Sequence, residues 1–485
     1  MRQNTTANRF KSKVAVAQGD SEQGSVESLA NLSPKTIWQA VKKEHLAFWA
    51  ICGWLFFEYI KPQSIYPWLD FLPWSQICIL GAFVLSLAKG DKIAASKGLS
   101  GLHATFLMFG ALVLASSILA FDSAYSFSKL EVMGQWFVIY YLVLKIINTE
   151  QRFFIFFLLY MLCNFKMSQH GFVSWVSRGF SFADFGVTGS PGWFQNSGEF
   201  AMQMLIFLPL SVAFITAFKH RWSKLLYYFM LLFPISAFSC VLASSSRGGV
   251  LGLVGIGLLL LFQKKKMFKR LMVVMLFSFV AFLLLPAEFK ARFETAGDDG
   301  TSNLRLFYWG IASDMAADNP VLGVGYYNWI PYYKAYHFDP SIKYKAEEIH
   351  STYFQAMAEL GYSGLVLLLA FAFATWRLNR ATALAMLPYQ GEEMAKFYRN
   401  TAKALNIGSF SLFITCAFIS ALYYPFFWMQ GIFAGLLYGV SRIRYSPARA
   451  GKLPASGTVN TQRLRVGKQV GVVQPPPVPS FQSKK

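Results

Sequence analysis

The sequence contains few charged residues for its length, and this shortage excludes an ordinary soluble protein. Only 14% of its 485 residues are charged, whereas 55% are hydrophobic and 17% are aromatic. Soluble domains contain about 25% charged residues. Apolar runs long enough to cross roughly 30 Å of hydrocarbon repeat along most of the chain, which also excludes a protein with a single membrane anchor. These observations predict an integral membrane protein.

The sequence also lacks the patterns of two common kinds of site. Its five cysteines all lie inside or at the ends of apolar runs, and no two stand at the spacing of metal ligands. We therefore expect neither a disulfide framework nor a zinc site. No short cleavable apolar segment lies near the first residue, so we expect no signal peptide.

Twelve apolar runs are candidates for transmembrane helices, although several are shorter than the usual length of about 20 residues. The prediction is therefore an all-α polytopic membrane protein with about twelve transmembrane helices. The runs cover residues 46–60, 71–88, 101–120, 132–147, 153–170, 200–218, 225–243, 248–262, 271–286, 351–375, 404–422 and 426–440.

The basic residues are distributed unevenly between the two sides of the membrane. With the first residue inside the cell, 34 of the 45 Lys and Arg fall in cytoplasmic segments and ten fall outside, while Lys166 lies within a span. Because basic residues in short loops stay in the cytoplasm, we expect both termini to be cytoplasmic. The same bias explains the net charge of +21 without a nucleic-acid partner. The cytoplasmic segments are 1–44, 89–100, 145–152, 219–224, 263–270, 376–403 and 441–485.

Composition divides the chain into three parts. Residues 1–44 and 441–485 are polar tails that we expect to be disordered, and residues 45–440 form the transmembrane domain. The C-terminal tail is basic, so it either binds anionic lipid or is solvated without a partner. A predicted periplasmic loop of 63 residues, 287–349, separates the ninth and tenth helices. Loops of this length are usually functional, so we expect the chemistry there.

Arg247 stands at the start of the eighth apolar run, after three consecutive serines. An arginine beside a helix N-terminus, whose free N–H groups carry partial positive charge, forms an anion site. Its guanidinium group offers paired donors to a diphosphate. The alternative is an arginine that only extends its side chain to the membrane interface.

Arg305 lies in a predicted helix, residues 304–317, inside the long loop. Tyr308 and Trp309 follow it on neighbouring turns of that helix. The next segment, Asn319 to Gly325, is typical of a helix stop and a glycine turn that returns the chain toward the membrane. The alternative role for Arg305 is an ion pair with an acidic neighbour.

His350 comes directly before the tenth apolar run. At 100° per residue, Gly361 and Gly364 share its helix face and would let a neighbouring helix pack closely beneath it. A helix N-terminus disfavours imidazolium, so the ring is expected to be neutral and able to act as a general base. The alternative is a structural histidine at the membrane edge.

Four further residues are candidates for supporting roles. Glu347 and Glu348 orient the histidine, bind a cation with it, or form a solvated acidic turn; because no spaced carboxylates accompany them, we predict no metal site. Glu359 lies inside the tenth span, where ionisable groups are usually functional or paired. Asn196 and Glu199 start the sixth span, where simple helix capping explains both residues at least as well as contact with a substrate.

Three features in this order resemble the O-antigen ligase and polymerase superfamily of bacterial membrane glycosyltransferases. They are Ser246–Gly248 at the start of a span, Arg305–Trp309 followed by Asn319–Gly325, and His350 followed by Gly361 and Gly364. The resemblance is best over residues 190–370, and the tails lie outside it.

The resemblance implies an activity. In that superfamily a glycan linked to undecaprenyl diphosphate is transferred on the periplasmic face of the inner membrane to an acceptor hydroxyl, without nucleotide sugar, metal or other cofactor. By position, His350 matches the catalytic histidine, and Arg247 and Arg305 match the arginines that bind the diphosphate. The implied enzyme inverts the anomeric centre.

The sequence leaves the acceptor open. A ligase that completes lipopolysaccharide ranks first, and an O-antigen or exopolysaccharide polymerase and a protein O-oligosaccharyltransferase share the same motifs. A transporter of lipid-linked glycans is the alternative from another class. Broken helices in two corresponding halves would favour transport, and we find no such internal repeat.

Overall fold

The computed structural model describes residues 26–88, 99–181, 186–262, 300–337 and 347–445, and within these ranges it contains helices and no strands. The described residues up to Arg444 belong to one compact unit. The ninth predicted run, 271–286, lies outside the described residues. The predicted all-α class is confirmed for the part that the structure describes.

Every predicted run within the described residues forms a helix. These helices are α3 (Leu46–Tyr59), α5 (Trp74–Ala88), α6 (Ser100–Ile118), α7 (Ser123–Ile146), α8 (Glu150–Ser177), α9 (Ser197–Phe218), α10 (Lys224–Ala243), α11 (Arg247–Phe262), α16 (Thr352–Ala385), α17 (Glu393–Thr415) and α18 (Pro425–Arg444). Five helical segments are long and apolar enough to cross a membrane, namely Pro67–Leu87, Ser100–Ile118, Ser197–Arg221, Lys224–Ala243 and Thr352–Ala385, and α3 and α11 are shorter apolar helices. A multi-pass membrane protein is therefore supported, while the count of twelve stays a prediction.

The helix boundaries differ most from the prediction at α16 and α17. α16 continues to Ala385, ten residues past its apolar run, and α17 begins at Glu393, eleven residues before its run. In both places the helix extends through polar sequence, which an apolar pattern cannot detect. α17 ends at Thr415, so residues 416–424, predicted as the end of a span, form a non-helical loop before α18.

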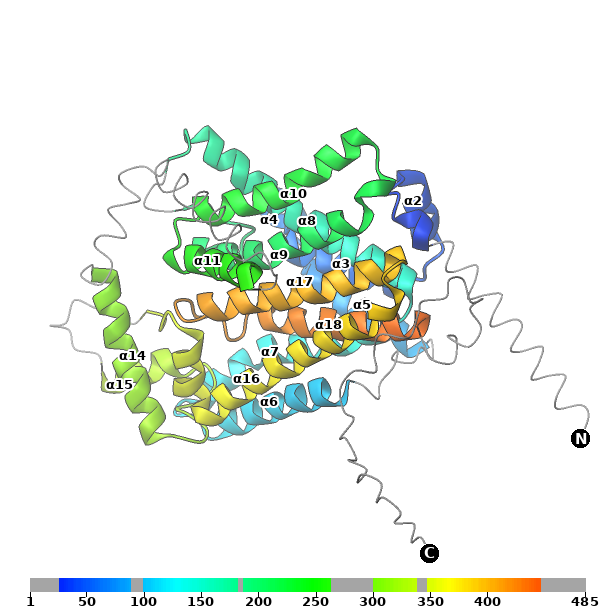
Figure 1. Ribbon diagram of the computed structural model, residues 1–485. Coiled ribbons are helices and arrows are strands. Elements are labelled where there is room, and N and C mark those ends of the chain that lie inside the picture. The colour runs from blue at the N-terminus through cyan, green and yellow to red at the C-terminus, as the bar shows by residue number, and fades with distance from the viewer. Residues whose placement is uncertain (1–25, 89–98, 182–185, 263–299, 338–346, 446–485) are drawn as a thin grey trace, which may run out of the picture. The chain divides into compact units, whose positions relative to one another are not determined.

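The centre of the bundle is α9, which packs against α8, α10, α11 and α17. α16 packs against α6, α17 and α18, and the long helices run side by side (Figure 1). Two further helices, α14 (Gly300–Asp318) and α15 (Trp329–Tyr336), lie at one end of the bundle, where α14 crosses the direction of the long helices (Figure 1). α14 confirms the helix predicted over residues 304–317.

The opposite end of the bundle is held by ion pairs. Arg152 of α8 pairs with Glu44 at 2.7 Å, Arg444 of α18 pairs with Glu150 at 3.2 Å, and Arg221 pairs with Glu393 at the start of α17. All these residues come from segments predicted to be cytoplasmic or from the end of α18. The segments that contain these ion pairs therefore meet at one end of the bundle, as expected for segments on one side of the membrane. The side on which they lie stays a prediction.

The prediction of a disordered tail over residues 1–44 is wrong for its second part. Residues 34–42 form α2 (Pro34–Lys42), and Val26 and Leu29 are fully buried. Trp222 donates a hydrogen bond from Nε1 to the carbonyl of Ala30 at 2.8 Å. The polar composition of the tail gave no indication that a few of its apolar residues pack against the bundle. Residues 1–25 and 446–485 lie outside the described residues, and residues 441–444 belong to α18.

Candidate functional site

Two indole side chains hold the segment that contains His350. Trp309 of α14 donates a hydrogen bond from Nε1 to the carbonyl oxygen of Ile349 at 3.0 Å, and its ring stacks on Phe354 at 5.1 Å. Trp329 of α15 donates from Nε1 to the carbonyl oxygen of Glu347 at 2.8 Å. α14, α15 and the residues around Ile349 also share one apolar core. The two helices of the long loop therefore fix the backbone directly before the candidate base.

His350 lies outside the helix that follows it. Its φ of 57° is in the left-handed region, which non-glycine residues adopt rarely and often at functional sites. Ser351 occupies the N-cap position, and α16 begins at Thr352. The local turn therefore separates the imidazole from the regular backbone of α16.

Burial and then the positive charge of Arg305 lower the pKa of His350 from 6.5 to about 4. The predicted neutral ring agrees with this value, but its cause is the surroundings of the ring and the guanidinium of α14 rather than the helix N-terminus. Arg305 and His350, 45 residues apart in the sequence, therefore lie near enough for the guanidinium charge to lower the pKa of the ring. A site that binds an anionic substrate and also accepts a proton needs a cationic group and a neutral base close together.

α16 is interrupted at Gly361, which has φ 69° and ψ −176°. The carbonyl oxygens freed by the break accept hydrogen bonds from the glycine turn: Val324 N donates to Ala358 O at 2.8 Å, and Gly325 N donates to Glu359 O at 3.2 Å. In a membrane span, freed backbone groups need such partners. The turn after α14 therefore completes the broken helix.

Two glycines make this contact possible. A Cβ atom on Gly361 would lie 2.6 Å from the carbonyl oxygen of Pro320, and one on Gly323, whose φ is 67°, would lie 2.4 Å from the carbonyl carbon of Glu359. The prediction that Gly361 and His350 share one helix face is wrong, because the helix is broken between them and the face is not continuous. The glycine admits a backbone turn instead of a neighbouring helix.

Glu359, predicted as an intramembrane candidate, lies at the break with 3% of its surface exposed. Its Oε2 accepts a hydrogen bond from Tyr423 Oη at 2.7 Å. The ring of Tyr423 stacks on Tyr327 at 4.6 Å with an interplanar angle of 26°. Glu359 therefore holds Tyr423, whose ring contacts Tyr327, and its supporting role at the site stays a prediction.

The loop 416–424 connects the starts of three helices. Its Cys416 carbonyl accepts from Thr352 N at 2.8 Å, at the start of α16. Its residues 418 and 419 border Gly248 of α11 and Gly198 of α9, at 3.3 Å and 3.0 Å from the Cβ positions of these glycines. Arg247, the first residue of α11, therefore lies at the same end of the bundle as the start of α16. Ser246 caps α11, because its Oγ accepts from Gly249 N at 3.2 Å.

A group of carboxylates and aromatic rings lies beside this loop. Glu348, which is accessible to solvent, has a pKa raised to about 7 by surrounding protein atoms and by Glu199. Asn196 does not cap α9; its Nδ2 donates to Glu199 Oε1 at 3.2 Å instead. Tyr424 lies within range of the charges of Glu348 and Glu199, and its ring centroid is 4.9 Å from that of Trp193. We call Glu199, Glu348, Trp193 and Tyr424 the acidic aromatic wall.

Sequence reasoning missed Trp193, Tyr327, Tyr423 and Tyr424. The chain contains 13 Trp and 23 Tyr, so a single aromatic residue at a membrane edge carries no signal. The side chain of Glu347 is exposed, and no contact of it with His350 is described, so its predicted orienting role stays a prediction. Within the described residues no three His, Cys, Asp or Glu side chains are grouped as metal ligands.

The fold and the site together define a multi-pass helical membrane protein with a basic and imidazole-containing site at one end of its bundle. Residues 232–369 match the model of the O-antigen ligase family. This segment contains Arg247, Arg305, His350 and the break in α16, so the resemblance inferred from the sequence is confirmed there. The match supports a membrane glycosyltransferase of the ligase and polymerase type. No curated protein matches the chain.

Proposed function

We propose that this protein is an O-antigen-ligase-type glycosyltransferase of the bacterial inner membrane, which moves a glycan from undecaprenyl diphosphate to an acceptor hydroxyl on the periplasmic face. The observation that carries the proposal is that Arg305 and a neutral His350 lie near one another inside the matched segment, where the guanidinium charge lowers the pKa of the ring. Arg305 is suited to stabilise the anionic leaving group, and His350 is suited to take the proton of the acceptor.

The proposed reaction is one displacement. The acceptor oxygen attacks the anomeric carbon while its proton passes to His350, and the bond from that carbon to the diphosphate oxygen breaks. Arg305 and Arg247 stabilise the charge on the departing undecaprenyl diphosphate with paired hydrogen bonds. Attack opposite the leaving group inverts the anomeric centre. Phosphate charge balanced by guanidinium groups needs no metal, so we propose a metal-independent enzyme without a cofactor.

The acidic aromatic wall supports a carbohydrate acceptor. Half-exposed aromatic rings such as Trp193 and Tyr424 pack against the apolar faces of sugars, and the exposed Glu348 offers oxygens that accept from sugar hydroxyls. This surface favours a ligase that uses a lipid-linked saccharide acceptor, with a polymerase second, over an enzyme that glycosylates a protein.

The break in α16 does not favour the transporter alternative. Transport folds of the inverted-repeat type use broken helices in corresponding positions of two halves. Among the described helices, α16 alone contains a non-helical residue of this kind. Its freed carbonyls at Ala358 and Glu359 are also occupied by the glycine turn, which leaves them unavailable to a transported ion.

The test is a reaction of purified protein with lipid-linked glycan and a panel of saccharide, lipid and peptide acceptors, with free undecaprenyl diphosphate as the readout. We expect release that depends on an acceptor and persists in EDTA. Arg247→Ala should weaken the interaction with the donor by about 2 kcal/mol, because a charge-assisted hydrogen bond is lost. Arg247→Lys should restore this interaction in part. Movement of the donor across proteoliposomes without any release would support a transporter and reject the proposal.

A further inference from the structure

A groove between α6 and the second half of α16 lies far from His350. Its volume is about 500 Å³, and Tyr438 of α18 contributes to its wall. Ser116, near the end of α6, bonds to the carbonyl of Glu359 at the break, whereas the groove is lined by the first residues of α6. Arg377, in the groove, follows Thr352 by 25 residues, or roughly 38 Å of helix. The groove therefore lies at the end of the bundle opposite to the proposed transferase site.

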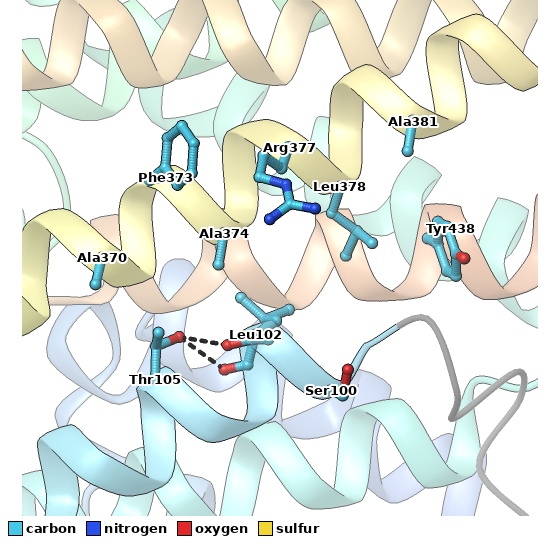
Figure 2. Close-up of a pocket in the computed structure, with 11 residues that line it drawn as sticks. Ser100, Leu102, Thr105, Ala370, Phe373, Ala374, Arg377, Leu378, Ala381 and Tyr438 are labelled. Carbon is cyan, nitrogen blue, oxygen red and sulfur yellow. Dashed lines mark hydrogen bonds between the residues drawn. The ribbon is translucent and has the colours of Figure 1, made fainter.

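The groove is lined mainly by apolar side chains, with three hydroxyl groups and one charged group among them. Leu102, Phe373 and Leu378 form its walls together with alanines, and the side chain of Arg377 points from α16 toward α6 (Figure 2). The hydroxyl of Thr105 already donates to the carbonyl oxygens of its own helix, as the dashed lines in Figure 2 mark. A guanidinium group is thus the one charged group among the lining residues.

No acidic side chain in the described part of the chain pairs with Arg377. Three arginines at the same end of the bundle, Arg152, Arg221 and Arg444, each bind a glutamate instead. A guanidinium group beside an apolar cavity and without a carboxylate suits a phosphate that comes from outside the chain.

The surroundings of the groove mark it as facing lipid at the level of the headgroups. Phe373 on α16 is 57% exposed and Leu107 on α6 is 64% exposed, so both helices present apolar side chains outward beside it. Trp376 precedes Arg377 in the sequence, and the guanidinium group of Arg380 lies over the ring of Trp376, 5.4 Å from its centroid. Tryptophan and arginine at a helix end are typical of the membrane interface. Arg442, over the ring of Tyr438 at 4.6 Å, adds positive potential at the same mouth.

We propose that this groove binds one anionic glycerophospholipid, with its phosphate on Arg377 and an acyl chain along Leu102, Phe373 and Leu378. Two observations select this occupant: the apolar walls fit an acyl chain, and the positive charges at the mouth favour a headgroup with net negative charge over a zwitterionic one. The site is separate from the proposed transferase site and does not depend on that function.

The test is native mass spectrometry of the purified full chain released from nanodiscs that contain equal amounts of phosphatidylglycerol and phosphatidylethanolamine. We expect the protein to retain one phosphatidylglycerol in preference to phosphatidylethanolamine. Arg377→Gln should weaken that retention about tenfold, as expected for the loss of one charge-assisted contact. Arg380→Gln is the matched control, because it removes the same charge three residues away and outside the lining, and it should change retention less than twofold.

A second variant tests the acyl chain separately from the charge. Ala374 lines the groove opposite α6, so Ala374→Phe narrows the groove while Arg377 stays in place, and it too should lose the lipid (Figure 2). Equal retention by Arg377→Gln and the parent, or no preference between the two lipids, overturns the proposal. Inorganic phosphate that displaces the lipid at millimolar concentration, or that binds equally well to Ala374→Phe, shows a simple anion site and also overturns it.

Discussion

His350 combines a ring that is free to accept a proton with a pKa that makes it a weak base. At about 4, this pKa lies well below the pH at which a periplasmic enzyme works, and an efficient general base has a pKa near that pH. The positive charge of Arg305 contributes to the depression. A diphosphate bound to Arg305 would offset this charge, so donor binding should make His350 a stronger base. His350 would thereby gain its full basicity only in the complex with the donor.

The catalytic role of His350 is tested by His350→Gln. Glutamine keeps hydrogen-bonding capacity near the ring but cannot take a proton, so we expect a loss of roughly 100-fold or more in transfer rate with donor binding retained. The measurement is the rate of undecaprenyl diphosphate release with donor and acceptor saturating. A rate within a few-fold of the parent would show that His350 only packs.

The charge coupling between Arg305 and His350 predicts a pH effect. The free protein should titrate His350 near pH 4, so that the base is protonated and lost only below that pH. Arg305→Gln, or bound donor, should move the midpoint upward toward 6.5. Histidine-labelled NMR measures it, with the resonance assigned by its absence in His350→Gln.

Glu348 is the control for this titration, because its pKa of about 7 places it in the same pH range. The upward shift should persist in Glu348→Gln. A His350 midpoint that is the same with and without the Arg305 charge would contradict the coupling.

At the scale of elements, α16 and the glycine turn form one unit. Residues 319–325 supply donors to the broken helix, and Tyr362 N donates back to Pro320 O at 2.8 Å. The same turn carries the chain from α14, which holds Arg305, to α15. The distance between Arg305 and His350 therefore depends on the turn remaining docked in the break.

Gly361→Ala tests this docking. The new methyl group would stand 2.6 Å from the Pro320 carbonyl oxygen at a φ of 69°, and we expect a loss on the order of 2 kcal/mol or more in stability together with reduced transfer. Gly310→Ala is the matched control, because nothing lies within 4 Å of its Cβ position and alanine favours helix there by up to about 1 kcal/mol. Thermal unfolding in detergent compares the two. Equal melting temperatures would show that the turn is not tightly docked.

These elements show where sequence reasoning succeeds and where it stops. Arg247, Arg305 and His350 stand out because charged and imidazole groups are rare beside long apolar runs. Gly361 was identified as significant, but a periodicity of 100° per residue presupposes an unbroken helix, and a positive φ at one glycine cannot be read from spacing. The hydrogen bond between Tyr423 and Glu359 joins residues 64 apart, which no local pattern reveals.

At the scale of the whole molecule, the two ends of the bundle differ in chemistry. One end carries α14, α15 and the candidate site, and the other carries α2, the paired arginines and the Arg377 groove. The apolar runs predicted the helices well because hydrocarbon imposes their length, whereas residues 26–44 and the loop 416–424 were misjudged because a few long-range contacts decide their structure. The sidedness of these ends is the remaining prediction.

That sidedness is testable by labelling of single cysteines, because the native thiols interfere little: Cys52, Cys163, Cys240 and Cys416 are buried, and Cys78 is easily replaced. Tyr336 at the end of α15 is 65% exposed, and Gly391 before α17 has open space at its Cβ position. Since 34 of 45 basic residues fall in segments predicted to share one side with Gly391, we expect that end to be cytoplasmic. A membrane-impermeant maleimide added to spheroplasts should therefore label Tyr336→Cys at once and Gly391→Cys only after the membrane is opened. The reverse pattern would place Arg305 and His350 in the cytoplasm and would remove the basis for a periplasmic transfer reaction.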